Sequence, residues 1–247
     1  VRQRGSWEAA RVRFLTMALR AWPRSVLIDA GSNVGVYSLT AARVGRKVLA
    51  IDANYRSALR LAKSAQANGL SGLIHVYWNA LSNRPGGSEL RLRLPAGCNV
   101  GGAAPLEGAD RGRDDDFVDE AVRPRAAGLD QLIASSGGHL AGARGVFLKL
   151  DIEGQEWSAF ATGQKLFSNH TVPLVLMEWG GTAVHRPNLA VWMLQFLTGR
   201  GYKPYELRPT GDQANALVPL PLPHWRAWPG DILWTKNATL LTDGWRV

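Results

Sequence analysis

Three acidic residues in this sequence each follow directly on a run of apolar residues. Asp29, Asp52 and Asp151 come after runs that are long enough, and aliphatic enough, to form buried strands. Such runs are typical of the inner strands of a parallel sheet, and open α/β sheets bind their ligands at the carboxyl ends of those strands. We therefore expect these carboxylates to lie at a ligand site on one edge of a sheet.

The first of these carboxylates opens a turn that contains glycine. Residues 26–28 predict a strand, and apolar residues recur at helical spacing in residues 36–42. Between them, Gly31 allows a sharp turn and the close approach of a ligand, and Ser32 or Asn33 is expected to cap the helix. The N–H groups at such a helix start can bind an anion or a carboxylate.

The spacing of the glycines in this turn argues against a dinucleotide. A dinucleotide-binding turn needs Gly-x-Gly-x-x-Gly, whereas Gly31 and Gly35 are four residues apart and Asn33 stands where the second glycine belongs. Asn33 can offer its amide to the zwitterionic end of an amino-acid-like ligand, and Asp29 can accept from an ammonium group. This combination favours S-adenosylmethionine over NAD. The alternative is a strand, turn and helix that bind no ligand.

The second carboxylate is placed to bind a ribose. Asp52 follows Gly31 by 21 residues, and in doubly wound folds an acid at about this distance accepts hydrogen bonds from the ribose hydroxyls. We assign that role to Asp52, with Ala53 beside it. Asn79 and Ala80 end the third predicted strand and are expected next to the adenine. The alternative is that Asp52 only caps the helix that follows.

The third carboxylate belongs to a dense group of charged residues. The alternation of a strand would place Lys149, Asp151 and Glu153 on one side. Charged groups at the end of a buried strand are costly to bury unless they are paired or used, which favours a functional role. Glu178 ends the next predicted strand, so that Asp151 and Glu178 could hold Mg²⁺. No ligand set in the sequence is specific enough to assign a metal, and we assign none.

Strands and helices alternate along most of the chain. Besides the first strand and helix, strands are expected at 47–53, 73–81 and 172–179, a strand with its turn at 145–156, and helices at 54–68, 128–135, 157–167 and 189–197. This alternation predicts a mostly parallel sheet with helices on both faces. The last two predicted strands, 203–207 and 231–235, are expected to form a hairpin at its edge.

Two segments interrupt this pattern. Residues 84–125 are rich in glycine, proline and charge. Within them 89–94 alternates like a strand, and the rest is expected to be a loop of the kind that often covers a substrate. The acidic run at 114–116 is expected to be solvated, because three adjacent acids do not converge on one point. The second segment, 209–230, is expected to be a proline-rich loop.

Composition indicates one globular domain with a basic surface. The chain has 247 residues, a net charge of +9 and a single cysteine, Cys98, which excludes an intramolecular disulfide. A charge of this sign permits contact with nucleic acid, acidic glycans or a membrane surface. Residues 1–24 predict a basic amphipathic helix, which either docks on the domain or offers its arginines to an anionic partner. No stretch is apolar for the length of a membrane span.

Two features bear on location. The chain begins with Val1 and not with methionine, so we expect that a preceding segment was removed. Asn169-His170-Thr171 and Asn237-Ala238-Thr239 are acceptor sequences for N-glycosylation. Together they favour a glycoprotein of the secretory pathway, in the Golgi lumen, over a cytoplasmic protein.

Three blocks of the sequence resemble the FkbM family of S-adenosylmethionine-dependent methyltransferases. Residues 28–35 resemble its D-x-G-x-N-x-G opening, residues 148–156 its K-x-D-x-E-G-x-E block, and residues 175–178 its next strand. The second block is the most specific of the three. The family usually has Glu-Pro after its second strand, where this sequence has Asp52-Ala53. The resemblance covers residues 25–236, within a domain of residues 25–247.

The resemblance implies a class I methyltransferase, a Rossmann-like three-layer sandwich around a seven-stranded sheet. It also implies O-methylation of a hydroxyl on a sugar, a glycan or a small metabolite. A hydroxyl is a weak nucleophile, so a general base should assist. We assign that role to Asp151 or Glu153, with Lys149 orienting them and with His185 or Glu178 as further candidates.

Three other functions are alternatives to O-methylation of a sugar, a glycan or a small metabolite. An NAD-dependent oxidoreductase would need the missing glycine and a Tyr-x-x-x-Lys, which is absent. A nucleic-acid amino-methyltransferase usually has Asn/Asp-Pro-Pro-Tyr/Phe after the fourth strand, where this chain has residues 151–154, Asp-Ile-Glu-Gly. A binding domain that keeps the fold without catalysis is the third alternative.

Overall fold

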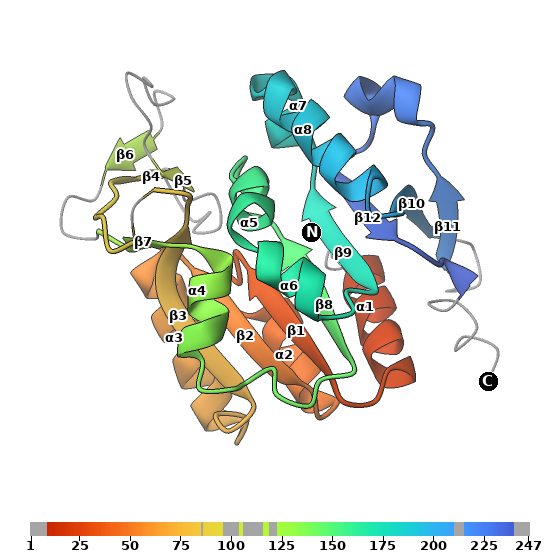
Figure 1. The fold of residues 1–247 in the computed structure, drawn as a ribbon. Coiled ribbons are helices and arrows are strands. Elements are labelled where there is room, and N and C mark those ends of the chain that lie inside the picture. Colours follow the sequence, from red (N-terminus) through yellow and green to blue (C-terminus); the bar gives the residue numbers. More distant parts are fainter. Residues whose placement is uncertain are drawn as a thin grey trace, which may run out of the picture.

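The computed structural model of the chain describes residues 9–84, 86–95, 104–105, 116–118, 123–209 and 215–239 (Figure 1). The helices found there are α1 (Ala9–Ala21), α2 (Val36–Arg43), α3 (Tyr55–Ala67), α4 (Leu129–Ser135), α5 (Glu156–Thr162), α6 (Gln164–Asn169), α7 (Gly180–His185), α8 (Pro187–Thr198) and the 3-10 helix η1 (Leu222–Ala227). The strands are β1 (Ser25–Ala30), β2 (Lys47–Asp52), β3 (Ile74–Leu81), β4 (Leu92–Pro95), β5 (Ala104–Pro105), β6 (Asp116–Val118), β7 (Arg125–Ala127), β8 (Gly145–Leu150), β9 (Leu174–Glu178), β10 (Lys203–Pro209), β11 (Asn215–Pro219) and β12 (Asp231–Thr235).

The described strands form a large sheet of nine strands and a small sheet of three. The order in the large sheet is β11-β10-β12-β9-β8-β1-β2-β3-β7. From β9 to β7 all neighbours are parallel, whereas β12, β10 and β11 are paired antiparallel. The predicted mostly parallel sheet with an antiparallel edge is confirmed. Because β1 lies between β2 and β8, the carboxyl ends of these three strands adjoin.

Helices cover both faces of the large sheet (Figure 1). On one face α1, α2 and α3 bury apolar side chains against it, including Phe14, Tyr37 and Leu61. On the other face a second core contains residues of α4 to α8, such as Phe160 and Met193. The helix predicted in residues 1–24 is seen as α1, while residues 1–8 lie outside the described part. None of the helices in the described ranges has the length and apolar character needed to cross a membrane.

The edges of the large sheet differ from the prediction. Seven strands were expected, and β7 and β11 extend the described sheet at its two ends. The strands at 203–209 and 231–235 do pair antiparallel, but β11 lies outside them and forms the edge. β11 lies within the segment 209–230 that was predicted as a loop, and β7 begins at Arg125, the last residue of the segment 84–125. Strands of three and five residues next to proline carry too little periodicity to be recognised.

The inserted segment 84–125 also contains more structure than expected. The predicted strand at 89–94 is β4, which begins at Leu92, and Glu89 forms only an isolated bridge to Arg125. Strands β5 and β6 flank β4 in the small antiparallel sheet. Of the acidic run, residues 114–115 lie outside the described residues and Asp116 begins β6.

Two helix boundaries were predicted incorrectly. Ser32 and Asn33 do not cap α2, which begins at Val36 with Gly35 at the capping position and no side-chain cap. Gly31, Asn33 and Gly35 have positive φ angles. Because such angles do not belong to a right-handed helix, the helix begins only after Gly35. The helix predicted at 157–167 is divided into α5 and α6 at Gly163, whose absent side chain leaves room for Leu129 of α4.

A cluster of tryptophans stabilises the antiparallel side of the sheet. The ring centroid of Trp179 lies 6.2 Å from that of Trp225, 5.3 Å from that of Trp228 and 6.3 Å from that of Trp234. Its Nε1 donates to the carbonyl of Trp225 at 2.8 Å. Trp179 directly follows Glu178, so this packing also fixes the end of β9.

Replacing Trp179 by alanine should therefore lower the free energy of unfolding by about 3–5 kcal/mol, because a large buried ring is removed and leaves a cavity. Urea denaturation followed by circular dichroism measures this. The matched control is Val184→Ala, whose side chain is 69% exposed and whose effect should stay within about 0.5 kcal/mol. Equal effects of the two substitutions would contradict the prediction.

Candidate active site

A buried lysine joins the turn after β1 to the end of β8. Lys149 is 5% exposed, and its Nζ donates to the carbonyl oxygen of Gly31 at 2.7 Å. The same ammonium lies 3.5 Å from Oδ1 of Asp29 and 3.5 Å from Oδ2 of Asp151. Asp29 is fully buried and also accepts a hydrogen bond from Ser38 Oγ at 2.6 Å. Asp29 therefore holds Lys149 within the protein.

The turn after β1 has a shape that few residues allow. Gly31 has a φ of +75°, and a Cβ at this position would overlap the carbonyl oxygen of Asp151. Asn33 has a φ of +49°, a region that asparagine tolerates better than most residues. This explains why asparagine can stand where a dinucleotide site has glycine. The backbone N–H of Asn33 donates to Oδ2 of Asp52 at 2.7 Å, so the turn positions that carboxylate.

Asp52 lies at the end of β2 with both oxygens held by the backbone. Its Oδ1 accepts from the N–H of Asn54 at 2.7 Å, opposite the bond from Asn33. Its side chain is largely buried, and burial raises the pKa of Asp52 to about 6 against the lowering effect of these hydrogen bonds and of Lys149. The carboxyl group is therefore ionised at neutral pH and becomes neutral in mild acid.

A pocket at this edge of the sheet collects most of the predicted cofactor residues. Gly31, Asp52, Ala53, Asn79 and Ala80 all contribute to its lining. The structure thus brings the ends of β1, β2 and β3 to one place, as the sequence predicted.

The opposite wall of the pocket is formed by the segment after β8. Asp151 and Glu153 line it, together with Ile152 and Gln155, which were not singled out from the sequence. Gln155 is buried. Its place within the K-x-D-x-E-G-x-E block is the only feature of the sequence that could have indicated it.

The remaining predicted residues stand behind the pocket and do not line it. Asp29 and Lys149 are paired with each other, and Gly35 packs against Leu61. Ser32 and Asn33 lie in the turn, and the side-chain oxygens Ser32 Oγ and Asn33 Oδ1 are buried without a hydrogen-bond partner among the described residues. These residues shape the turn, and contact with a ligand remains a prediction for them.

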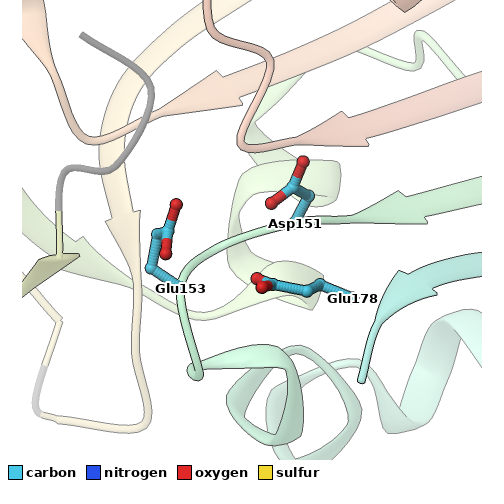
Figure 2. A group of neighbouring side chains, drawn as sticks. All are labelled: Asp151, Glu153 and Glu178. Carbon is cyan, nitrogen blue, oxygen red and sulfur yellow. The ribbon is translucent and has the colours of Figure 1, made fainter. Parts of the chain in front are cut away.

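Three carboxylates converge beside the pocket. Oxygen atoms of Asp151, Glu153 and Glu178 all lie within 4.8 Å of one another, and Figure 2 shows the side chains gathered around one space. The alternation proposed from the sequence does not explain this arrangement, because β8 ends at Leu150. Glu153 reaches the group through a turn in which its φ is +55°. Glu178 arrives from β9, the strand beside β8.

Glu178 is the most perturbed acid of this group. Burial raises its pKa to about 8, and the negative charges of neighbouring acids, Glu156 first, raise it as well. Its Oε2 is buried and accepts no hydrogen bond from the described part of the chain. A group of this kind can take up a proton near neutral pH. The spacing of the three carboxylates would also suit a divalent cation.

An ion pair next to Glu178 was not predicted. Asp231 is the register partner of Glu178 on β12, and Arg11 of α1 lies 2.5 Å from Oδ2 of Asp231. The pair joins segments 220 residues apart in the sequence, and no local pattern indicates it. His185, the other base candidate, is an exposed residue at the end of α7 and belongs neither to the pocket nor to the carboxylate group.

Comparison with known families agrees with this geometry. The model of the methyltransferase FkbM domain matches residues 29–204, which contain both the turn after β1 and the segment after β8. The chain belongs to the FkbM methyltransferase family. This FkbM domain accordingly uses S-adenosylmethionine as its cofactor. A search of curated proteins found no match.

Solved methyltransferase structures are similar to this FkbM domain at low identity. An O-methyltransferase of Thermotoga maritima is 15% identical with a TM-score of 0.45, and the match covers 92% of this chain and 65% of that one. TomG, an O-methyltransferase of tomaymycin synthesis from Streptomyces achromogenes in complex with SAM, is 14% identical with a TM-score of 0.48, over 94% and 80% of the two chains. A Bacillus cereus O-methyltransferase in complex with SAH is 10% identical with a TM-score of 0.46, over 96% and 84%.

The residues around the pocket fit S-adenosylmethionine. Each oxygen of Asp52 accepts one backbone N–H and keeps a lone pair for a ribose hydroxyl. The Nδ2 of Asn79 donates to the carbonyl of Arg125 at 3.0 Å, so its amide oxygen can accept from the adenine amino group. These are the groups that would hold the cofactor.

Cofactor binding by Asp52 should depend on pH in one direction. A ribose hydroxyl donates to the ionised carboxylate, so affinity for S-adenosylmethionine should be constant above a pH of about 6, given the raised pKa. Below that pH it should fall, approaching about tenfold per unit. Asp52→Asn should weaken binding by about 10–100-fold at neutral pH and abolish this dependence. Isothermal titration calorimetry measures both effects.

The matched control is Asp130→Asn. Asp130 also accepts two backbone N–H bonds, from Lys165 at 2.8 Å and Leu166 at 3.0 Å, but it lies outside the pocket lining. This variant should lose stability without losing affinity for the cofactor. Unchanged binding in Asp52→Asn, with the fold intact, would contradict the ribose assignment.

Proposed function

We propose that this FkbM domain methylates a hydroxyl group of a sugar, a glycan or a small metabolite. The observation that supports this most directly is the group of three carboxylates beside the cofactor pocket, in which Glu178 has a pKa of about 8. Methyl transfer to oxygen benefits from a base that removes the hydroxyl proton. Carboxylates are also common hydrogen-bond acceptors for sugar hydroxyls.

Each charged residue of the site has a separate role in this proposal. S-adenosylmethionine, when bound, supplies a methyl group on a positively charged sulfur. The carboxylate of Glu178 accepts the proton of the acceptor hydroxyl. Asp151 and Glu153, which line the pocket, accept hydrogen bonds from the acceptor and orient it. Lys149 keeps Asp151 in place through the contact at 3.5 Å. Alignment of the acceptor hydroxyl with the methyl group as a whole can lower the barrier by on the order of 7–11 kcal/mol.

This assignment moves the base from Asp151 or Glu153 to Glu178. Asp151 is already engaged with the ammonium of Lys149 at 3.5 Å. Glu153 is exposed to water. Glu178 is the more buried group, without a hydrogen-bond partner at Oε2 among the described residues, and its raised pKa suits proton transfer near neutral pH.

The group of three carboxylates favours methylation of a sugar, a glycan or a small metabolite over methylation of nucleic acid. Three carboxylates at the acceptor side would repel a phosphate backbone, although the net charge of the chain is +9. A binding domain without catalysis is the remaining alternative, and it predicts no turnover with any acceptor.

A location in the secretory pathway remains part of the proposal. Asn169 and Asn237, the two sequence acceptors for N-glycans, are both exposed. Their exposure is compatible with glycosylation. Treatment of the protein from its native cells with a glycosidase, followed by mass measurement, tests it.

The acceptor class can be tested directly. The purified domain is incubated with labelled S-adenosylmethionine and separate panels of glycans, small hydroxylated metabolites, lipids and RNA. Label is expected in a glycan or a small hydroxylated compound, as a methyl ether. Transfer to RNA alone would contradict the proposal, and so would an absence of transfer to every panel.

Glu178→Gln should lower kcat by about 10²–10⁴-fold, because the amide cannot accept a proton. In the unaltered enzyme, kcat/KM for the cofactor should rise with pH and level off above about 8, where Glu178 is ionised. The variant should lack this rise. Full turnover with an unchanged pH profile in Glu178→Gln would exclude Glu178 as the base.

Asp231→Asn is the matched control for this variant. Asp231 raises the pKa of Glu178 through its negative charge, and the substitution also removes the carboxylate that Arg11 contacts. Both changes should lower the pKa of Glu178. The rise in kcat/KM should therefore move to lower pH while the base itself is retained. A purely structural role of Asp231 would lower activity without moving the profile.

A divalent cation at the three carboxylates is the competing role for this group. A general base requires no metal, so activity should persist in the presence of EDTA. Loss of activity in EDTA, followed by recovery on addition of Mg²⁺, would assign the carboxylates to a metal instead.

A further inference from the structure

The positive charge of the chain is concentrated in one part of the sequence. Residues 9–73 contain ten lysines and arginines and two acidic residues, Asp29 and Asp52. Both acids are buried. Residues 74–247 contain 17 basic and 17 acidic residues. The whole net charge of +9 therefore comes from the first 73 residues.

This part of the sequence forms β1 and β2 of the large sheet and the helices α1, α2 and α3. The three helices pack on the same face of the sheet and form one outer layer of the fold. In Figure 1 these helices lie behind the sheet, and α4 to α8 lie in front of it. The outer surface of α3 carries the exposed cations Arg56, Arg60 and Lys63, and the sequence of this helix contains no acid.

Apolar side chains are exposed at one end of the same layer. Tyr55 is 43% exposed and Leu59 is 38% exposed, and they are one turn apart on α3. The ring of Trp78, 39% exposed, lies 5.0 Å from the ring of Tyr55. Its Nε1 donates to the carbonyl of Ala53 at 3.0 Å, so this apolar group adjoins the cofactor pocket, which Ala53 lines.

Two further apolar residues extend this end of the layer. Val34 and Val36 are 39% and 43% exposed at the start of α2. Gly35, between them, packs against Leu61 of α3. The apolar group is thus bordered by cations on α3. Residues 9–73, which form these helices, contain no exposed acid.

We propose that the outer surface of α2 and α3, with Tyr55, Leu59 and Trp78, docks on a membrane that contains anionic lipid. Tyrosine and tryptophan favour the boundary between headgroups and acyl chains. Helices that lie in this boundary carry lysine and arginine on their polar side and leucine or aromatic residues on the other. Anionic headgroups attract such cations. The outer surface of α2 and α3 combines exposed cations with exposed apolar side chains, as a membrane-binding surface does.

The same observations favour a membrane over nucleic acid. Single strands stack their bases on open aromatic faces. Here the rings of Tyr55 and Trp78 pack edge to face at 63°, and aliphatic side chains adjoin them. This arrangement suits partial immersion in a bilayer boundary better than stacking.

Sedimentation with lipid vesicles tests the proposal. The full chain is mixed with vesicles of phosphatidylcholine alone, or of phosphatidylcholine with phosphatidylserine. Binding to the second kind only is expected at a salt concentration of about 0.1 M. It should decline strongly toward 1 M, where the screening length falls from about 10 to about 3 Å. Equal binding to both kinds, or to neither, would overturn the proposal.

Two pairs of variants separate the contributions of charge and apolar contact. Arg60→Glu with Lys63→Glu should weaken binding by about tenfold or more. The control with the same change in charge is Lys165→Glu with Lys236→Glu, on α6 and after β12. Lys236 lies 5.0 Å from the ring of Tyr202, which belongs to the core on the opposite face of the sheet. This control should keep most of the binding.

Tyr55→Ser with Leu59→Ser should also weaken binding, whereas Val184→Ser with Val191→Ser, on α7 and α8, should leave it unchanged. Circular dichroism confirms that each variant is folded. Equal losses in a test pair and its control would overturn the assignment of the surface. Binding to RNA that exceeds binding to the vesicles would assign the surface to nucleic acid. None of these measurements depends on methyl transfer, so their failure would leave the proposed function untouched.

Discussion

The buried ammonium of Lys149 holds the two walls of the site together. It contacts the carbonyl of Gly31 on one wall and Asp151 on the other, with Asp29 behind it. Burying a cation costs several kcal/mol unless partners compensate for the lost water. Here two carboxylates and a carbonyl do so. Loss of Lys149 would leave Asp29 as an unpaired charge in the core, which typically costs about 3–5 kcal/mol, and would separate the turn from the end of β8.

Carboxylates at one edge of the sheet have different properties because their surroundings differ. Asp52 receives two backbone N–H bonds, and burial still raises its pKa to about 6. It is therefore an acceptor at neutral pH. Glu178 is buried without such bonds at Oε2 and lies among other acids, and its pKa rises to about 8. The fold thus places an acceptor for the cofactor at the end of β2 and a candidate base at the end of β9, with β1 and β8 between these two strands.

Much of the cofactor side of the site could be predicted from the sequence. Gly31 begins the turn after β1, Asp52 ends β2, and Asn79 lies near the carboxyl end of β3. The carboxyl ends of parallel strands meet wherever the strands are neighbours. Predictions from strand alternation and from helix-capping residues were less accurate where the backbone is neither helix nor strand. Glu153 joins the carboxylates through a turn with positive φ and not through strand alternation. Similarly, the turn at Asn33 moves the start of α2 to Val36.

The family, most of the order of strands and helices, and the carboxylates that end the strands could all be derived from the residues alone. These depend on residue types at short spacing, which periodicity and motifs report. The folded chain shows in addition that Glu178 meets Asp151, that Arg11 reaches Asp231, and that the exposed cations of α3 lie on the face opposite α4 to α8. These contacts depend on which strands are neighbours in the sheet and on which face each helix packs. Burial, and with it the pKa of Glu178, exists only after the chain has folded, because desolvation is caused by groups distant in the sequence.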